Sequence, residues 1–135
     1  MVNTRFTNWE KPVITHGVPT KWHWLVLHPE GLTLGANTDI GAFTLLVAKH
    51  GIEIQEEVQI GSHCAIYSYS TIDDKVGKVT LKKNCRIGTH SSIMPGVTVG
   101  ENAIVGAHSF VIEDVPANSI VVGVPARPLK KLNDR

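Results

Sequence analysis

Three histidines recur at one position of a repeating pattern in the 135-residue sequence. His63, His90 and His108 each stand three residues after an aliphatic residue, in the segments IGSH, IGTH and VGAH. A histidine that faces an open cleft can take a proton from an attacking hydroxyl or amine near neutral pH. A turn position that accepts any polar residue would explain the pattern equally. The same phase also holds three asparagines, Asn37, Asn84 and Asn102.

The element that positions these histidines is set by a six-residue period of aliphatic residues. Six residues rotate an α-helix by about 600°, so a helix cannot keep this period on one face. A coil with three short flat sides, one hexapeptide per side, does keep it, and stacked coils bury a continuous core. The period therefore predicts an all-β parallel β-helix. The aliphatic positions are Leu34, Ile40, Leu46 and Ile52; Ile54, Ile60, Ile66 and Ile72; and Leu81, Ile87, Ile93, Val99, Val105 and Val111.

One interruption of the period is long. The interval from Ile66 to Leu81 exceeds one repeat, which predicts an extruded loop at residues 71–79, TIDDKVGKV. In an alternative arrangement, Ile72 keeps its phase and a shorter insertion follows it. Functional residues concentrate on loops held by a rigid scaffold, so Asp73 is a second catalytic candidate, able to orient a histidine or bind an amine. The shift from Ile52 to Ile54 predicts a small bulge.

The two ends depart from the repeat. Residues 1–31 contain all three tryptophans and are predicted to cap the β-helix or to contact a neighbouring subunit. The β-helix is expected over residues 32–116 and a short tail over residues 117–135, within a single domain. A net charge of +1 argues against a nucleic-acid surface, and the apolar runs are too short for membrane insertion. Cys64 and Cys85 are expected to be reduced and buried in a cytoplasmic protein.

The C-terminal half carries a specific resemblance. The segment IGTHSSIMPGVTVGENAIVGAHSFVIEDVPANSIVVGVPARPLKKL resembles the hexapeptide-repeat acyltransferases, especially the galactoside, maltose and antibiotic O-acetyltransferases and the amino-sugar N-acetyltransferases. The IMPGV step, the acidic-Val-Pro turn and GVPA occur in the family's order over residues 79–131. Residues 32–70 share the repeat alone. The resemblance implies a left-handed β-helix, a homotrimer, and an acetyl-CoA-dependent acetyltransferase that acts on a sugar or nucleotide-linked amino sugar in surface-polysaccharide biosynthesis.

The resemblance also implies where acetyl-CoA binds, in a groove between adjacent subunits. By family position, Gly88 with Thr89 and Gly106 with Ala107 form the wall that contacts the cofactor. Glycines that merely turn the coil are the alternative explanation. A basic cluster near the cofactor phosphates is expected at Arg127, Lys130 and Lys131, with a solvated tail as the alternative.

The usual family base does not transfer to this sequence. The family pattern laid on IGSHCAIYSYST places Thr71 where the family has its histidine. His63 and His90 are the leading replacements because they flank the loop, with Asp73 as a further candidate. His108 lies one coil further away.

Two other functions stay open at this point. An enzyme resembling γ-class carbonic anhydrase would bind zinc through three histidines from two subunits, two of them five residues apart. His23 and His28 have that spacing but precede the repeats, and we expect no resident metal. In this alternative, stacked histidines at His63, His90 and His108 would bind the metal across a trimer axis. A non-enzymatic trimeric β-helix module is the other alternative. The GVPA tail argues against it, because the cofactor-using branch shares that tail.

Overall fold

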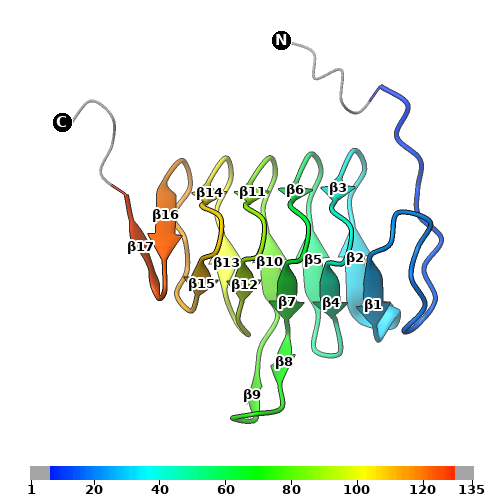
Figure 1. Ribbon diagram of the computed structural model, residues 1–135, viewed down its shortest axis with the longest axis horizontal. Helices are drawn as coiled ribbons and strands as arrows, with labels where there is room; N and C mark the ends of the chain where they lie inside the picture. The colour runs from blue at the N-terminus through cyan, green and yellow to red at the C-terminus, as the bar shows by residue number, and fades with distance from the viewer. Residues whose placement is uncertain (1–6, 130–135) are drawn as a thin grey trace.

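The structure is a computed structural model that describes residues 7–129. Short strands stack into three sheets, which form the three sides of a β-helix (Figure 1). Sheet 1 contains β1 (Leu25–Leu27), β4 (Leu45–Val47), β7 (Ala65–Tyr67), β12 (Ser92–Ile93) and β15 (Phe110–Val111). Sheet 2 contains β2 (Leu32–Leu34), β5 (Ile52–Ile54), β10 (Val79–Leu81) and β13 (Thr98–Val99). Sheet 3 contains β3 (Asp39–Ile40), β6 (Gln59–Ile60), β11 (Arg86–Ile87), β14 (Ile104–Val105), β16 (Ile120–Gly123) and β17 (Ala126–Pro128).

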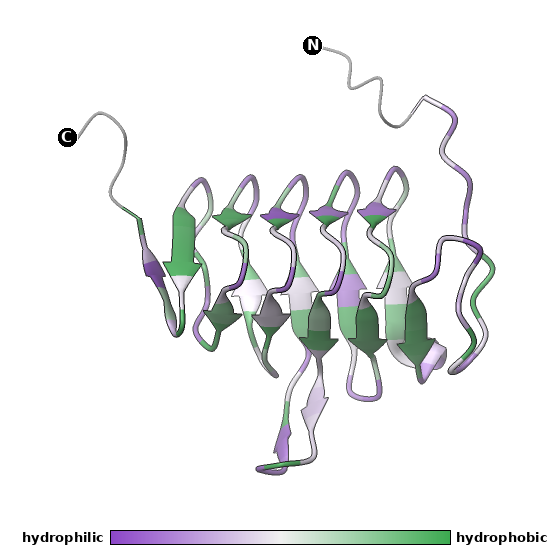
Figure 2. Cartoon of the chain, in the orientation of Figure 1, coloured by the Kyte–Doolittle hydropathy of each residue, from purple (hydrophilic) through white to green (hydrophobic). Residues whose placement is uncertain are grey.

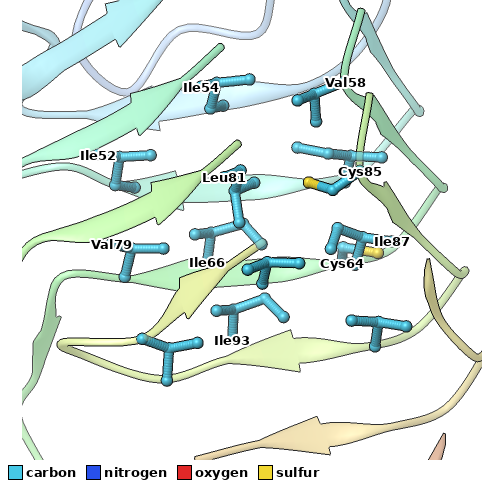
Figure 3. Close-up of a cluster of buried hydrophobic side chains, with 14 of the residues drawn as sticks. Ile52, Ile54, Val58, Cys64, Ile66, Val79, Leu81, Cys85, Ile87 and Ile93 are labelled. Atoms are coloured by element: carbon cyan, nitrogen blue, oxygen red, sulfur yellow. The ribbon is translucent and has the colours of Figure 1, made fainter. Parts of the chain in front are cut away.

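The core lies along the axis of this prism and confirms the six-residue period. Equivalent aliphatic residues of successive coils are paired in parallel register, as Leu46 is with Ile66 and Ile66 is with Ile93. All three side chains are fully buried, and Figure 3 shows Ile66 and Ile93 within the cluster of core side chains. Burial of one such side chain stabilises the fold by about 1.5–3 kcal/mol. Cys64 and Cys85 lie in the same core as free, buried cysteines, as expected.

The chain turns three times per coil, and we name the corners 1–2, 2–3 and 3–1 after the sheets they join. The position three residues after the aliphatic residue has a left-handed backbone at the last two corners, for example φ 59° at His90 and φ 61° at Asn84. Histidines and asparagines therefore share this position of the repeat because its backbone adopts a left-handed turn conformation. The asparagines lie at the 2–3 corner, where Glu57 takes this position in one coil, and the three histidines lie at the 3–1 corner, where Phe43 does so.

Glycine at the position after the aliphatic residue has a different purpose. A Cβ on Gly88 would lie 2.5 Å from the backbone nitrogen of Ala107 in the next coil. Glycine is needed there because the backbones of neighbouring coils approach closely, and its φ is not in the left-handed region.

The coils differ in length mainly at the 1–2 corner. There, β8 (Tyr69–Ser70) and β9 (Lys75–Val76) form an antiparallel hairpin that projects from the body (Figure 1). Ile72 is 97% exposed, so the alternative that kept it in the core is wrong. The excursion also begins and ends earlier than the expected 71–79, because Val79 is a buried residue of β10 paired with Ile52.

Ile52 and Ile54, whose two-residue spacing interrupts the six-residue period, lie in one strand. Both side chains are buried within β5, so the two residues belong to the same side of the coil. The extra length lies in the 1–2 corner before the strand, where Gly51 N–H donates to the Ala48 carbonyl, 2.9 Å. The first coil accommodates its extra residues in the 3₁₀ turn η2 (Pro29–Gly31) at the same corner. The expected bulge is therefore a longer corner turn.

Parallel pairing extends beyond the expected boundaries of 32 and 116. β1 pairs with β4 at the N-terminal end, and β16 pairs with β14 at the C-terminal end, because Val26 and Val121 still point into the core. The chain before β1 crosses the end of the prism (Figure 1). At the other end β17 folds back antiparallel on β16. Residues 7–129 contain no helix with the length and hydrophobicity needed to span a bilayer.

Candidate functional site

The histidines of the 3–1 corner form one stacked column. The ring centroids of His63 and His90 are 4.6 Å apart, and those of His90 and His108 are 4.8 Å apart, with nearly parallel planes. Phe43 continues the column below His63 at 5.0 Å. The column follows from successive coils placing the same left-handed turn residue one above another. The stacked rings confirm the predicted column. All three histidines are exposed, so the column is open to a ligand.

A hydrogen bond at Nδ1 anchors the ring of His90. The Thr89 hydroxyl donates to the Ser62 carbonyl, 2.8 Å, and its oxygen lies 2.9 Å from His90 Nδ1. The neutral tautomer with hydrogen on Nδ1 fits both contacts, because Thr89 Oγ1 can then accept from Nδ1–H while its hydroxyl donates to Ser62. Nε2 then carries the lone pair. This is the arrangement that a general base requires, with one ring nitrogen anchored and the other available.

A groove of about 380 Å³ lies beside the column, on the outer face of sheet 3. All four residues predicted for the cofactor wall line it: Gly88, Thr89, Gly106 and Ala107. Within residues 7–129, the backbone N–H groups of Thr89 and Ala107 have no hydrogen-bond acceptor. The groove therefore offers two main-chain donors to a ligand, next to the histidines.

Asp73 lies elsewhere in the protomer. It belongs to the hairpin at the 1–2 corner, whereas His63 precedes β7 at the 3–1 corner, so the strand separates them. A hydrogen bond from the Ser70 side chain, with help from Lys75, lowers the pKa of Asp73, which favours the carboxylate. Thr71 is exposed on the same hairpin. Within one chain the structure does not bring this carboxylate to the histidines.

The basic cluster is only partly described. Arg127 is exposed on β17, where its Nη1 donates to the Ala126 carbonyl and lies 3.8 Å from Glu113 Oε1. This strand is at the C-terminal edge of sheet 3, beyond the groove. Lys130 and Lys131 lie outside the described residues.

Within the described part of a single chain, the histidines do not converge on one point. The rings in the column are stacked at interplanar angles of 6° and 12°, so their nitrogens lie side by side instead of meeting at one point. Within residues 7–129, no three His, Cys, Asp or Glu side chains are placed to share a metal ion. His23 and His28, which have the five-residue spacing, contact Phe43 and His16 respectively.

Two participants were missed by sequence reasoning. Ser62 supports Thr89, and Asp39 lines the groove from β3. Ser62 shares the position of Thr89 in its own repeat, so the stacking of IGSH on IGTH could have identified the pair. Asp39 precedes an inward isoleucine like any outward strand residue, and no spacing distinguishes it.

Comparison with known proteins finds similarity over the C-terminal repeats. Residues 78–113 match the model of the bacterial transferase hexapeptide (six repeats) family. The galactoside O-acetyltransferase of Escherichia coli is 46% identical over 57 residues, which is 42% of this chain and 28% of that protein. The matched stretch thus spans less than a third of this curated relative.

Solved structures extend the similarity to most of the chain. A maltose O-acetyltransferase from Clostridium difficile superposes with a TM-score of 0.75 and 29% identity, covering 81% of this chain and 63% of that one. AntD, an N-acyltransferase from Bacillus cereus in complex with dTDP and coenzyme A, gives 0.67 and 28%, covering 86% and 82%. The expected fold, a left-handed parallel β-helix of hexapeptide repeats, is confirmed.

Proposed function

Because the chain carries the repeats of the bacterial transferase hexapeptide family, we propose that the protein is an acetyl-CoA-dependent acetyltransferase with a sugar acceptor. The observation that carries this proposal is the histidine column beside the groove, with His90 anchored at Nδ1 by Thr89 so that Nε2 is the ring nitrogen without this contact. The coenzyme A complex of AntD and the named acceptors of the galactoside and maltose enzymes support the same chemistry.

The base acts on the hydroxyl or amine of the acceptor. Acetyl-CoA supplies the acetyl group as a thioester. His90 Nε2, or that of its stacked neighbour His63, accepts the acceptor's proton while the oxygen or nitrogen forms a bond to the carbonyl carbon. The imidazolium then gives this proton to the sulfur as the carbon–sulfur bond breaks. The products are the acetylated acceptor and the free thiol of coenzyme A.

The groove wall has two tasks in this reaction. The N–H groups of Thr89 and Ala107 donate to the amide carbonyls of the pantetheine arm or to the oxyanion of the tetrahedral intermediate. The absence of a Cβ at Gly88 and Gly106 keeps the wall close to the next coil. Arg127 and Lys130 supply positive charge for the phosphates, and Asp73 contributes through a neighbouring subunit's groove.

A homotrimer is part of the proposal. The outward side chains of sheet 1 are largely apolar and half-buried in the single chain, and its strands β1, β4 and β7 are hydrophobic in Figure 2. These outward residues include Leu25, Leu45, Ala65 and Phe110. A face of this composition favours contact with a second copy of the chain. The free, buried cysteines support a cytoplasmic location.

The test measures thiol release from acetyl-CoA with methyl glycosides and amino sugars as acceptors. We expect His90→Ala or His63→Ala to lower kcat by about 100-fold or more, because a general base is lost. His108→Ala is the matched control from the same column and should retain most of the activity. Full turnover in both His63→Ala and His90→Ala would refute the assigned base.

Binding separates the proposal from its alternatives. We expect coenzyme A to bind at micromolar to millimolar concentrations, with the groove variant Ala107→Pro, which removes one N–H donor, binding more weakly. No binding at millimolar concentrations would refute the transferase. Bound zinc with bicarbonate-forming activity would favour the carbonic anhydrase alternative.

A further inference from the structure

A second pocket lies at the N-terminal end of the β-helix. It has a volume of about 440 Å³, and the segment before β1 forms one wall while β3 forms the other. All three tryptophans of the chain line it: Trp9, Trp22 and Trp24. The function proposed above does not use this pocket.

The aromatic walls of the pocket are held by specific contacts. Trp9 Nε1–H donates to the Thr38 carbonyl, 2.8 Å, across a separation of 29 residues. Trp24 is 3% exposed and belongs to the core, so it forms the inner side of the pocket. Trp22 is 37% exposed, and the ammonium of Lys21 lies 4.9 Å from its ring centroid. Trp22 is therefore the ring with the most surface left for a ligand.

The charges around these rings favour hydroxyl or ammonium groups. The carboxylates of Glu10 and Asp39 and the ammonium of Lys21 line the pocket. Lys21 Nζ is paired with Glu10 Oε1 at 2.7 Å, and each carboxylate has more lone pairs than a single partner uses. Carboxylates accept hydrogen bonds from hydroxyl groups and attract ammonium groups, whereas they repel phosphate esters.

The pocket lies next to the groove of the proposed active site. Asp39 lines both the pocket and the groove on sheet 3. Trp22 directly precedes His23, whose carbonyl accepts from Phe43 N–H at 2.7 Å and whose ring is stacked 6.3 Å from that of Phe43. Phe43 in turn contacts His63. A ligand seated in the pocket is thus at the first coil of the corner that holds the histidines.

We propose that this pocket binds the ring of an uncharged sugar or an amino sugar, with the apolar face of the ring on Trp22 and its hydroxyl or amine groups on Glu10 and Asp39. An amphipathic ring of this kind matches both an aromatic wall and carboxylate acceptors. As an acceptor subsite the pocket rests on the proposed acetyltransferase function. Sugar binding itself does not, because it needs neither acetyl-CoA nor the histidines.

The test is a titration of tryptophan fluorescence without acetyl-CoA. Since every tryptophan lines this pocket, the signal reports on it directly. The probes are methyl β-D-galactopyranoside, methyl α-D-glucopyranoside and D-glucosamine, with ADP as the anionic aromatic competitor. We expect a saturable change at millimolar concentrations with at least one sugar and none with ADP. Saturation by ADP alone, or by no probe, would overturn the proposal.

Variants locate the binding. Trp22→Ala should weaken the sugar about tenfold, because a stacking contact of roughly 1 kcal/mol or more is lost, and Trp22→Phe should recover most of it. Val13→Ala, an exposed residue of the same segment outside the pocket, is the matched control. His90→Ala should bind the sugar normally, which separates this proposal from the catalytic one. Unchanged sugar affinity in Trp22→Ala, with coenzyme A binding showing that the variant is folded, would refute the pocket assignment.

Discussion

Gly100 is a position where we expect one added methyl group to damage the β-helix. A Cβ there would lie 2.4 Å from Ala117 N and 2.9 Å from the Pro116 carbonyl carbon, both backbone atoms of the next coil. That is about 1 Å short of ordinary contact. Moving the coils apart by this amount would break the bond from Gly100 N–H to the Val115 carbonyl, now 2.8 Å. Overpacking and one lost hydrogen bond together give a loss of about 2–4 kcal/mol for Gly100→Ala.

Substitutions at two other glycines separate the effect of close contact from that of backbone strain. At Gly106 the nearest atom to an added Cβ is Cγ1 of Val122, a side chain near the surface that can turn away, so Gly106→Ala should cost less than about 1 kcal/mol. At Gly96 an added Cβ meets nothing within 4 Å, but φ is +86°. Gly96→Ala should therefore lose about 1–2 kcal/mol through backbone strain alone.

The assay is urea unfolding followed by circular dichroism, at one fixed protomer concentration because assembly would make stability concentration-dependent. We expect the free energy of unfolding to fall in the order Gly100→Ala, Gly96→Ala, Gly106→Ala, from largest loss to smallest, with an unchanged denaturant slope. A Gly100→Ala variant within about 0.5 kcal/mol of the parent would show that the coils are not as closely packed as this reasoning requires.

Two further predictions concern titratable groups. Burial raises the pKa of Cys64 and raises that of Cys85 to about 12, so neither thiol should react with a disulfide reagent at pH 8 until the protein is unfolded; rapid labelling of the native protein would contradict this. Hydrogen bonds from Gln55 and Lys78 lower the pKa of Glu53, so its contribution is present above the pKa of an unfolded glutamate and is lost as pH falls through the folded value. Glu53→Gln should therefore flatten the acid side of the stability profile, by less than about 1 kcal/mol for a surface pair, and an unchanged profile would rule this contribution out.

The repeat was readable from the sequence because the core imposes a chemical requirement at every inward position. Ile66 and Ile93 must be apolar, and their spacing follows from the length of one side of the coil. The histidine column could be predicted for the same reason, because residues at the same position of successive repeats lie at the same corner of the β-helix. The length of a corner carries no such requirement. The boundary at Val79 was therefore missed, although its strand was recognised.

Other parts of the site depend on contacts without a sequence period. The contact of Trp9 with Thr38 joins the irregular segment to the second of the three corners, and only the folded chain brings them together. The tautomer of His90 depends on which acceptor receives the Thr89 proton, which no spacing reveals. Asp73 was placed on the right element, but the direction in which the hairpin projects could not be read from its composition.

The coverings at the two ends of the β-helix have a consequence for assembly. A stack of parallel coils presents unpaired main-chain groups at each end, where another stack could add and continue as a filament. At the first coil, Gly17 N–H already donates to the Val26 carbonyl, 2.8 Å. At the last coil, β17 pairs along β16 and presents Pro128, which has no N–H to offer. These contacts disfavour growth along the axis at the first edge of sheet 1 and the last edge of sheet 3, which favours association through the sides of the prism.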